Sequence, residues 1–264
     1  MKTRRLTKEQ LKNKPMGQIV VEDYCTTEIF VSYGLDYCCQ GNKTVEEACN
    51  MQGIETESVL NDLVKIYRLP IIRQEISMEP DPTFIVKYII NQRHQLLIPK
   101  IRQVEELLRK KPNGIADLNP AFYEVCIGFL DLCEELELHI RQEEDVVFSL
   151  IANLMDGKID KSIFDEAVIK ALVNNTCNDH EHIGKLIDHI RNLENRLIPP
   201  EIFDTLAACE VIAGTEGRDI PDEICSFYRV LHTDFGVLEG AIRESVHLEN
   251  NVFFPNLTRY LEMN

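Results

Sequence analysis

The sequence predicts an all-α protein in which a small N-terminal helical domain precedes an up-down four-helix bundle. Three observations support this fold class. Four long helical stretches follow residue 82, and most of them are joined by short connections. Their ends carry capping residues, prolines and glycines at the positions that helix termini favour. No stretch alternates apolar and polar residues around an Asn-Gly or Asp-Gly turn, as a β-hairpin would.

The N-terminal domain is expected to span residues 15–77. Its predicted helices lie near Gln18–Tyr33, from Thr44 onward, and near Glu57–Tyr67. Thr44 and Glu47 form a capping box, which is typical of a helix N-terminus. Two prolines in Met78-Glu-Pro-Asp-Pro82 exclude a continuous helix, so this segment predicts a linker at the domain boundary.

The bundle is expected over residues 82–262. Its helices are predicted at Thr83–Lys110, at Asn119–Met155, over a composite third stretch (Lys161–Val173 and Asn178–Leu197), near Glu201–Ala213, and at Pro221–Phe254. Asn119 and Pro120 offer a cap and a first-turn proline, while Pro255 is expected to bend or end the last helix. The core of such a bundle is a place where proteins build metal sites.

Composition excludes several classes of function. Acidic residues outnumber basic ones by 44 to 28, so the surface repels phosphate backbones and anionic lipids, and neither nucleic acid nor membrane is an expected partner. No apolar run approaches the roughly 20 residues that cross a bilayer. The nine cysteines do not follow the framework of a small secreted domain. They predict reduced thiols, mostly buried as small apolar side chains, and a cytoplasmic protein.

Histidines and glutamates on the long helices are candidate metal ligands. His139 and Glu143 stand four residues apart, which places both side chains on one face of a helix. Glu249 lies in a second stretch with the same carboxylate–Val–aromatic ending, and His180 lies on the third helix. The first bundle helix contributes only His94. A His/Glu pair at this spacing is also common on helix surfaces, so the spacing alone leaves a metal site open.

A double-cysteine motif near the N-terminus adds a family resemblance. The run Tyr33-Gly-Leu-Asp-Tyr-Cys-Cys-Gln-Gly-Asn42 resembles the motif of the repair-of-iron-centres family, the iron–sulfur cluster repair di-iron proteins. In that family a short N-terminal domain with Asp-Tyr-Cys-Cys-x-Gly precedes a hemerythrin-like bundle. The bundle motifs at 139–148, 180–184 and 248–255 are also similar. The resemblance covers about residues 16–262.

This resemblance implies a non-haem di-iron centre with bridging carboxylates. It also implies a stress-response role in restoring iron–sulfur clusters damaged by nitrosative or oxidative stress. By position, His139 and His180 match histidine ligands, and Glu143 and Glu249 match the bridging carboxylates. The implied partners are damaged iron–sulfur proteins, with dioxygen or nitric oxide as small ligands; a homodimer is left open.

Two positions depart from the family pattern. The family has a histidine where this chain has Asn91, and another where it has Ser245. His94 and His247 stand nearby as secondary candidates: His94 could reach a shifted ion, whereas His247 faces away on an ideal helix. Both absent histidines serve the same iron in the family. The sequence therefore predicts one intact metal position and a second that is weakened, rebuilt around His94, or empty.

Cys38 and Cys39 match the paired cysteines of the family, and we expect exposed thiols that handle iron or exchange disulfides. A buried pair at a helix end is the alternative. Iron–sulfur cluster repair is the favoured function, and the chain shows no catalytic triad or phosphate-binding glycine loop that would indicate a turnover enzyme. The alternatives are a hemerythrin-like dioxygen or nitric oxide sensor or carrier, and a bundle with a degenerate metal site. The double-cysteine domain favours repair, because a simple carrier does not need it.

Overall fold

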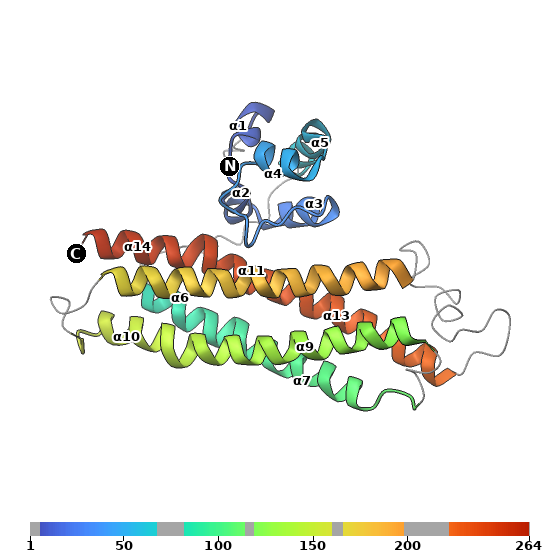
Figure 1. Ribbon diagram of the computed structural model, residues 1–264. Helices are drawn as coiled ribbons and strands as arrows, with labels where there is room; N and C mark the ends of the chain where they lie inside the picture. The colour runs from blue at the N-terminus through green and yellow to red at the C-terminus, as the bar shows by residue number, and fades with distance from the viewer. Residues whose placement is uncertain (1–5, 68–81, 114–118, 160–165, 198–221, 264) are drawn as a thin grey trace. The chain divides into compact units, whose positions relative to one another are not determined.

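The computed structural model describes residues 6–67, 82–113, 119–159, 166–197 and 222–263 (Figure 1). In these ranges the regular structure is helical, apart from an isolated bridge between Pro15 and Thr44. The all-α class is thereby confirmed, with a small N-terminal helical region followed by the long helices of a bundle. None of the described helices combines the length and the apolar character that crossing a membrane requires.

The chain divides into two compact units, one of residues 1–89 with 243–264 and one of residues 90–242. The N-terminal region contains α1 (Lys8–Lys12), α2 (Met16–Glu22), the 3₁₀ turn η1 (Tyr24–Thr26), α3 (Thr27–Ser32), α4 (Val45–Gln52) and α5 (Thr56–Ile66). The predicted linker at 78–82 lies almost wholly outside the described residues, as does the predicted helix at Glu201–Ala213. The predicted division at 77–82 therefore stays a prediction.

In the described residues after position 81, π-helical turns interrupt the long helices at three places. The elements in chain order are α6 (Pro82–Ile89), η2 (Ile90–His94, π), α7 (Gln95–Arg109), α9 (Pro120–Gln142), η3 (Glu143–Phe148, π), α10 (Ser149–Met155), α11 (Glu166–Leu197), α13 (Asp222–Leu248), η5 (Glu249–Phe253, π) and α14 (Phe254–Met263). The predicted cap is confirmed, since the Asn119 side chain accepts a hydrogen bond from the Phe122 N–H with Pro120 in the first turn.

In the N-terminal region the predicted helix at 18–33 is wrong, because the chain breaks at Asp23. The Asp23 backbone is extended (φ −151°, ψ 100°), and its carboxylate accepts a hydrogen bond from the Cys25 N–H at 3.1 Å. This local cap competes with continued helix, as aspartate side chains commonly do. The capping box of Thr44 and Glu47 is present as predicted.

Two further helix boundaries differ from the prediction. The third bundle helix has no break between 173 and 178, since α11 is continuous from Glu166 to Leu197. The last helix does not end near Phe254 but continues through η5 and α14 to Met263. Pro255 lies in the first turn of α14, where the missing N–H costs little, and the π turn before it shifts the backbone register.

The core of residues 90–242 is built from facing rings and aliphatic side chains. α9 packs against both α7 and α11. Phe129 of α9 meets Phe235 of α13 edge to face, with ring centroids 4.4 Å apart. Phe122 makes similar contacts with Phe227 and Tyr228. Such apolar contacts between four helical segments explain why their buried faces stay together.

Four of the eight described cysteines are buried, so the prediction that most cysteines are core residues holds for half of those described: Cys38, Cys49, Cys126 and Cys133. Cys126 and Cys133 are buried, and burial raises the pKa of each thiol to about 12. The prediction that all nine thiols are reduced is wrong for Cys225, which is disulfide-bonded. A disulfide requires the two Cα atoms to lie within about 7 Å of each other, and sequence spacing alone does not show which cysteines meet this condition.

A charged network ties α11 to α13 inside this unit. The Arg191 guanidinium donates to Glu239 Oε2 at 2.7 and 2.9 Å and to Glu194 Oε2 at 2.8 Å. His232 Nδ1 lies 3.3 Å from the other Glu194 oxygen, and the guanidinium lies over the Phe235 ring at 4.2 Å. Glu194 is 4% exposed, so its charge depends on these partners.

Replacing Arg191 by methionine removes the cation beside the buried carboxylate of Glu194 and the half-buried carboxylate of Glu239. We expect the free energy of unfolding to fall by roughly 3 kcal/mol, as when one partner of a buried ion pair is removed. Urea denaturation followed by circular dichroism measures this loss. Lys185→Met on the same helix is the control, because the exposed Lys185–Glu181 pair at 4.0 Å should contribute under about 1 kcal/mol. Equal losses in the two variants would contradict the assignment.

Candidate metal centre

Three histidines surround one carboxylate within residues 90–242. The Nε2 atoms of His139 (α9) and His180 (α11) both lie 3.4 Å from Glu143 Oε1. His94, at the end of η2, places its Nε2 3.3 Å from the other oxygen, Oε2. His94 and Glu143 are each 1% exposed and His180 is 0% exposed. Two imidazoles therefore face one side of Glu143, and a third faces its other side.

The environment of Glu143 fits a bound cation. Both carboxylate oxygens are buried and have no hydrogen-bond donor among the described residues. A buried charge without a partner is costly, and proteins usually pair it or use it to coordinate a metal. Imidazole nitrogens and carboxylate oxygens suit iron and other first-row metals. These side chains therefore offer the donor atoms of a metal site, and a bound cation would compensate the buried negative charge of Glu143.

His94 is held in the tautomer that a metal ligand needs. Its Nδ1 lies 2.9 Å from Glu144 Oε1, and its ring stacks on Phe148 with centroids 5.8 Å apart. Because a carboxylate only accepts hydrogen bonds, Nδ1 carries the proton and the Nε2 lone pair faces Glu143. Metal-binding histidines usually donate their second N–H in this way. Sequence reasoning missed this role of Glu144, for which the pair of adjacent glutamates was the only signal.

The π turns lie at the candidate metal ligands. η2 ends at His94, η3 begins at Glu143 and η5 begins at Glu249. A π turn inserts an extra residue into the helical register, and such turns are frequent at functional sites. In η2 the Asn91 side chain is exposed, whereas His94 is buried. The position where the family carries its histidine is thus not the position that faces inward here.

Glu249 is also buried, at 1% exposure, and Ser245 Oγ donates to its Oε1 at 2.8 Å. A hydroxyl that holds Glu249 therefore stands where the family has a histidine. Within residues 90–242, ligand atoms of His139, Glu143 and His180 all lie within 4.8 Å of one another and are buried. This buried His/Glu cluster is consistent with a di-iron site.

His247 has a different environment from the other candidates. Its ring packs edge-on against Tyr37 at a centroid distance of 5.6 Å, and its Nδ1 lies 3.2 Å from Asn251 Nδ2. Burial lowers the pKa of His247 to about 4, which keeps the imidazole neutral. The structure thus places His247 beside the loop of the double cysteine, and the ligand role predicted for it stays a prediction.

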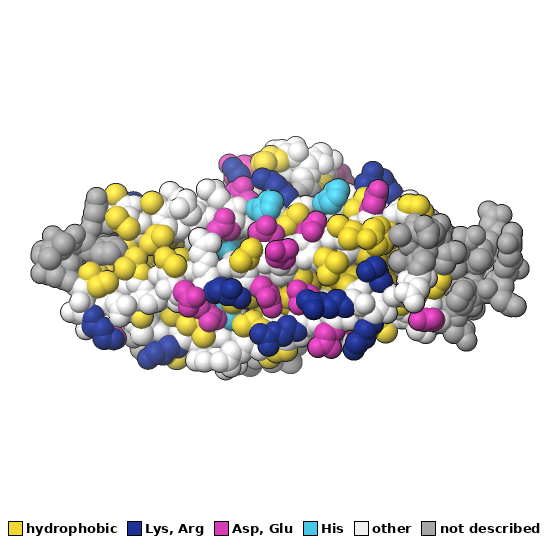
Figure 2. All heavy atoms as spheres, turned by 60° about the horizontal axis from the view of Figure 1, so that its bottom comes forward, with side chains coloured by type: hydrophobic (Ala, Val, Ile, Leu, Met, Phe, Trp, Pro, Cys, Tyr) yellow, Lys and Arg dark blue, Asp and Glu magenta, His cyan; other side chains and the backbone are white. Residues whose placement is uncertain are grey.

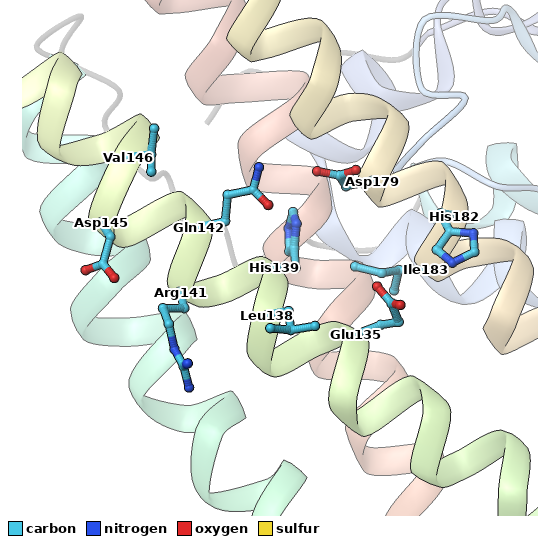
Figure 3. Close-up of a pocket in the computed structure, with 10 residues that line it drawn as sticks. All are labelled: Glu135, Leu138, His139, Arg141, Gln142, Asp145, Val146, Asp179, His182 and Ile183. Atoms are coloured by element: carbon cyan, nitrogen blue, oxygen red, sulfur yellow. The ribbon is translucent and has the colours of Figure 1, made fainter.

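A pocket of about 470 Å³ between α9 and α11 is lined in part by His139, one of the candidate metal ligands (Figure 3). His139 is the most exposed of the three clustered side chains, at 9%. Figure 3 shows its ring and the Asp179 carboxylate on the facing sides of the two helices, while Arg141 of α9 and Asp145 of η3 extend elsewhere. Acidic side chains and histidines also gather near the middle of the face in Figure 2. An acidic approach of this kind favours entry of cations.

The double cysteine forms a second group of potential ligands, with Asp36. Cys38 is buried, at 4% exposure, and Cys39 is half-buried. The expected exposure of both thiols is therefore wrong for Cys38, because the loop folds its side chain inward. The hydrogen bond with Cys39 and burial raise the pKa of Cys38 well above its ordinary value.

Comparisons with known proteins agree with this arrangement. Residues 87–257 match the family described as the hemerythrin HHE cation binding domain, and residues 12–67 match ScdA_N, a domain of unknown function. The chain is similar to the iron–sulfur cluster repair protein YtfE of Yersinia pestis (strain Pestoides F). It is also similar to the YtfE of Yersinia pseudotuberculosis serotype O:1b (strain IP 31758). Each is 23% identical over 255 residues, covering 94% of this chain and 98% of the relative.

Proposed function

This chain belongs to the family of hemerythrin HHE cation binding domains, and we propose that its buried His/Glu cluster holds two non-haem iron ions. The observation that carries this proposal is the position of Glu143 between imidazoles on both of its oxygens. Glu143 would hold iron together with His139 and His180, which lie beside its Oε1, and with His94, which lies beside its Oε2. Bridging carboxylates also neutralise adjacent cations in a buried site.

Each side chain has a distinct part in this proposal. His139 of α9 and His180 of α11 would hold iron together with Glu143. Glu249 would supply a second carboxylate, which accepts a hydrogen bond from the Ser245 hydroxyl. Glu144 keeps His94 in the binding tautomer. Bound iron would supply exchangeable coordination positions and an ion that can be donated, while the apolar bundle core excludes bulk water from the ligands.

The cellular role that we propose is repair of iron–sulfur clusters damaged by nitrosative or oxidative stress. The full-length similarity to YtfE supports it, since those relatives are iron–sulfur cluster repair proteins. Damaged iron–sulfur proteins would be the partners, in the cytoplasm, with Cys38 and Cys39 taking part in delivery. The pocket at His139 supports a route by which an ion or a small molecule reaches the cluster.

Binding of dioxygen or nitric oxide without iron donation is the second candidate function. The pocket that reaches His139 is the observation that favours it, because a small ligand could use the same access. The two functions differ in what leaves the protein: a repair protein loses iron to its client, whereas a carrier keeps its iron and releases the gas.

The test measures iron and repair together in one matched pair of variants. The protein is loaded with iron anaerobically and incubated with an iron–sulfur dehydratase that nitric oxide has inactivated. His180→Ala should lose most of its iron and its ability to restore the dehydratase. His182→Ala, exposed two residues further on the same helix, should keep both. Restoration that is equal in the two variants would rule out repair through this cluster, and gas binding without iron loss would favour the carrier.

A further inference from the structure

The loop of the double cysteine converges on one carboxylate. Asp36 Oδ1 accepts hydrogen bonds from the N–H groups of Cys38 at 3.1 Å and Cys39 at 2.9 Å. The Cys38 thiol also donates to this oxygen at 3.0 Å. The potential ligand atoms of these three residues all lie within 4.8 Å of one another. Three side chains of one short loop therefore present two sulfurs and one carboxylate to a common point.

The spacing of the two sulfurs suits a single metal ion. Cys38 Sγ and Cys39 Sγ lie 3.9 Å apart. In a tetrahedral site with metal–sulfur bonds of about 2.3 Å, two thiolates stand roughly 3.8 Å apart. A disulfide would instead need about 2.04 Å. The observed spacing thus matches two ligands of one ion, and three protein ligands leave a fourth position for exchange.

Contacts within the same unit hold the loop in this geometry. Asn251 Nδ2 donates to the carbonyl oxygen of Cys38 at 3.0 Å, and Asn250 donates to the same oxygen at 3.3 Å. The Asn251 amide lies so close to Gly17 and Gly41 that an added Cβ would come within 2.2 and 2.1 Å of its Oδ1. Only residues without a side chain allow this approach. The cysteine backbone is therefore fixed before any ligand arrives.

We propose that Asp36, Cys38 and Cys39 form a second metal site, separate from the bundle cluster, for a borderline divalent cation such as Fe²⁺, Zn²⁺ or Co²⁺. Thiolate ligands favour such ions over Mg²⁺ or Ca²⁺. Binding releases the two thiol protons to solvent as the sulfurs coordinate the ion, so no oxidant or reductant is needed. The identity of the natural ion as Fe²⁺ rests on the proposed repair function. The existence of the metal site does not depend on that function.

The test titrates Co²⁺ into the full-length, reduced protein without oxygen and follows the absorption of thiolate-to-cobalt charge transfer. We expect one equivalent to produce this absorption in the wild type. His180→Ala, which impairs the bundle cluster, should keep it, so failure of the proposed function and failure of this site are distinguishable. Cys38→Ser and Cys39→Ser should lose it. Asp36→Asn, which keeps an oxygen for the backbone N–H groups, should weaken Co²⁺ binding by roughly tenfold or more.

Cys25→Ser is the matched control, because Cys25 is an exposed cysteine of the same unit. It should leave the absorption unchanged. Persistence of the absorption in both Cys38→Ser and Cys39→Ser, or its absence from the wild type, would overturn the proposal. A measurement on unmutated protein covers the case in which a variant misfolds: one equivalent of Zn²⁺ should protect Cys38 and Cys39 from alkylation while Cys25 still reacts, as mass spectrometry can show. Equal reactivity with and without Zn²⁺ would also refute the site.

Discussion

Glutamine in place of Glu143 is expected to reduce the iron content below about one tenth of the wild-type value. Among the described residues, the Glu143 carboxylate lies beside His94, His139 and His180 together. An amide presents a single neutral oxygen and an NH₂ group that cannot coordinate, so both metal positions lose a ligand. Elemental analysis of anaerobically loaded protein measures the loss. Glu134→Gln, an exposed position on α9, should retain its iron.

The same substitution should stabilise the metal-free protein and abolish the additional stability that iron gives. In metal-free protein Glu143 is a buried carboxylate without a described hydrogen-bond donor, so removing its charge should raise the free energy of unfolding by about 1–3 kcal/mol. Iron at a hundredfold excess over its dissociation constant should stabilise the wild type by about 2.7 kcal/mol and the variant hardly at all. Urea denaturation with and without Fe²⁺ tests both. A metal-free variant less stable than the wild type would show that Glu143 serves packing and not metal binding.

The elements that could be predicted from the sequence are those whose ends depend on local chemistry. Asn119 with Pro120 begins α9, and Thr44 with Glu47 begins α4, because caps act within a single turn. The break at Asp23 was missed although an aspartate was there, since its side chain could cap a new turn or simply face solvent. The continuity of α11 was missed because packing against α9 can outweigh weak local helix propensity.

The sequence could predict which residue types form the candidate site, but not which helix positions face it. His139 with Glu143 is a spacing that any helix reveals, and those two side chains do meet. The inward position of His94 depends on the π turn η2. A π turn costs hydrogen-bond geometry locally and persists because tertiary contacts compensate, so no pattern of 3.6 residues per turn can anticipate it. The hydrogen bonds from Glu144 and Ser245 likewise depend on how side chains meet in the folded protein.

Alanine in place of His94 is expected to lower the iron content from about two ions per chain to about one. His94 is the described histidine on the Oε2 side of Glu143, whereas His139 and His180 both face Oε1. Its loss should therefore empty one position and spare the other. Elemental analysis gives the stoichiometry. Asn91→Ala in the same π turn should keep both ions, because the Asn91 side chain is exposed.

A second variant tests which position of this helix faces Glu143: position 94, as in this protein, or position 91, where the family carries its histidine. His94→Ala combined with Asn91→His restores the histidine where the family carries it, yet we expect the iron content to stay near one ion per chain. The reason is geometric: η2 directs position 91 to solvent and position 94 to Glu143, and one substitution does not remove a π turn. Recovery of the second ion would mean that this segment can revert to α-helical register once His94 is absent. The orientation of His94 would then follow from the ion and not from the fold.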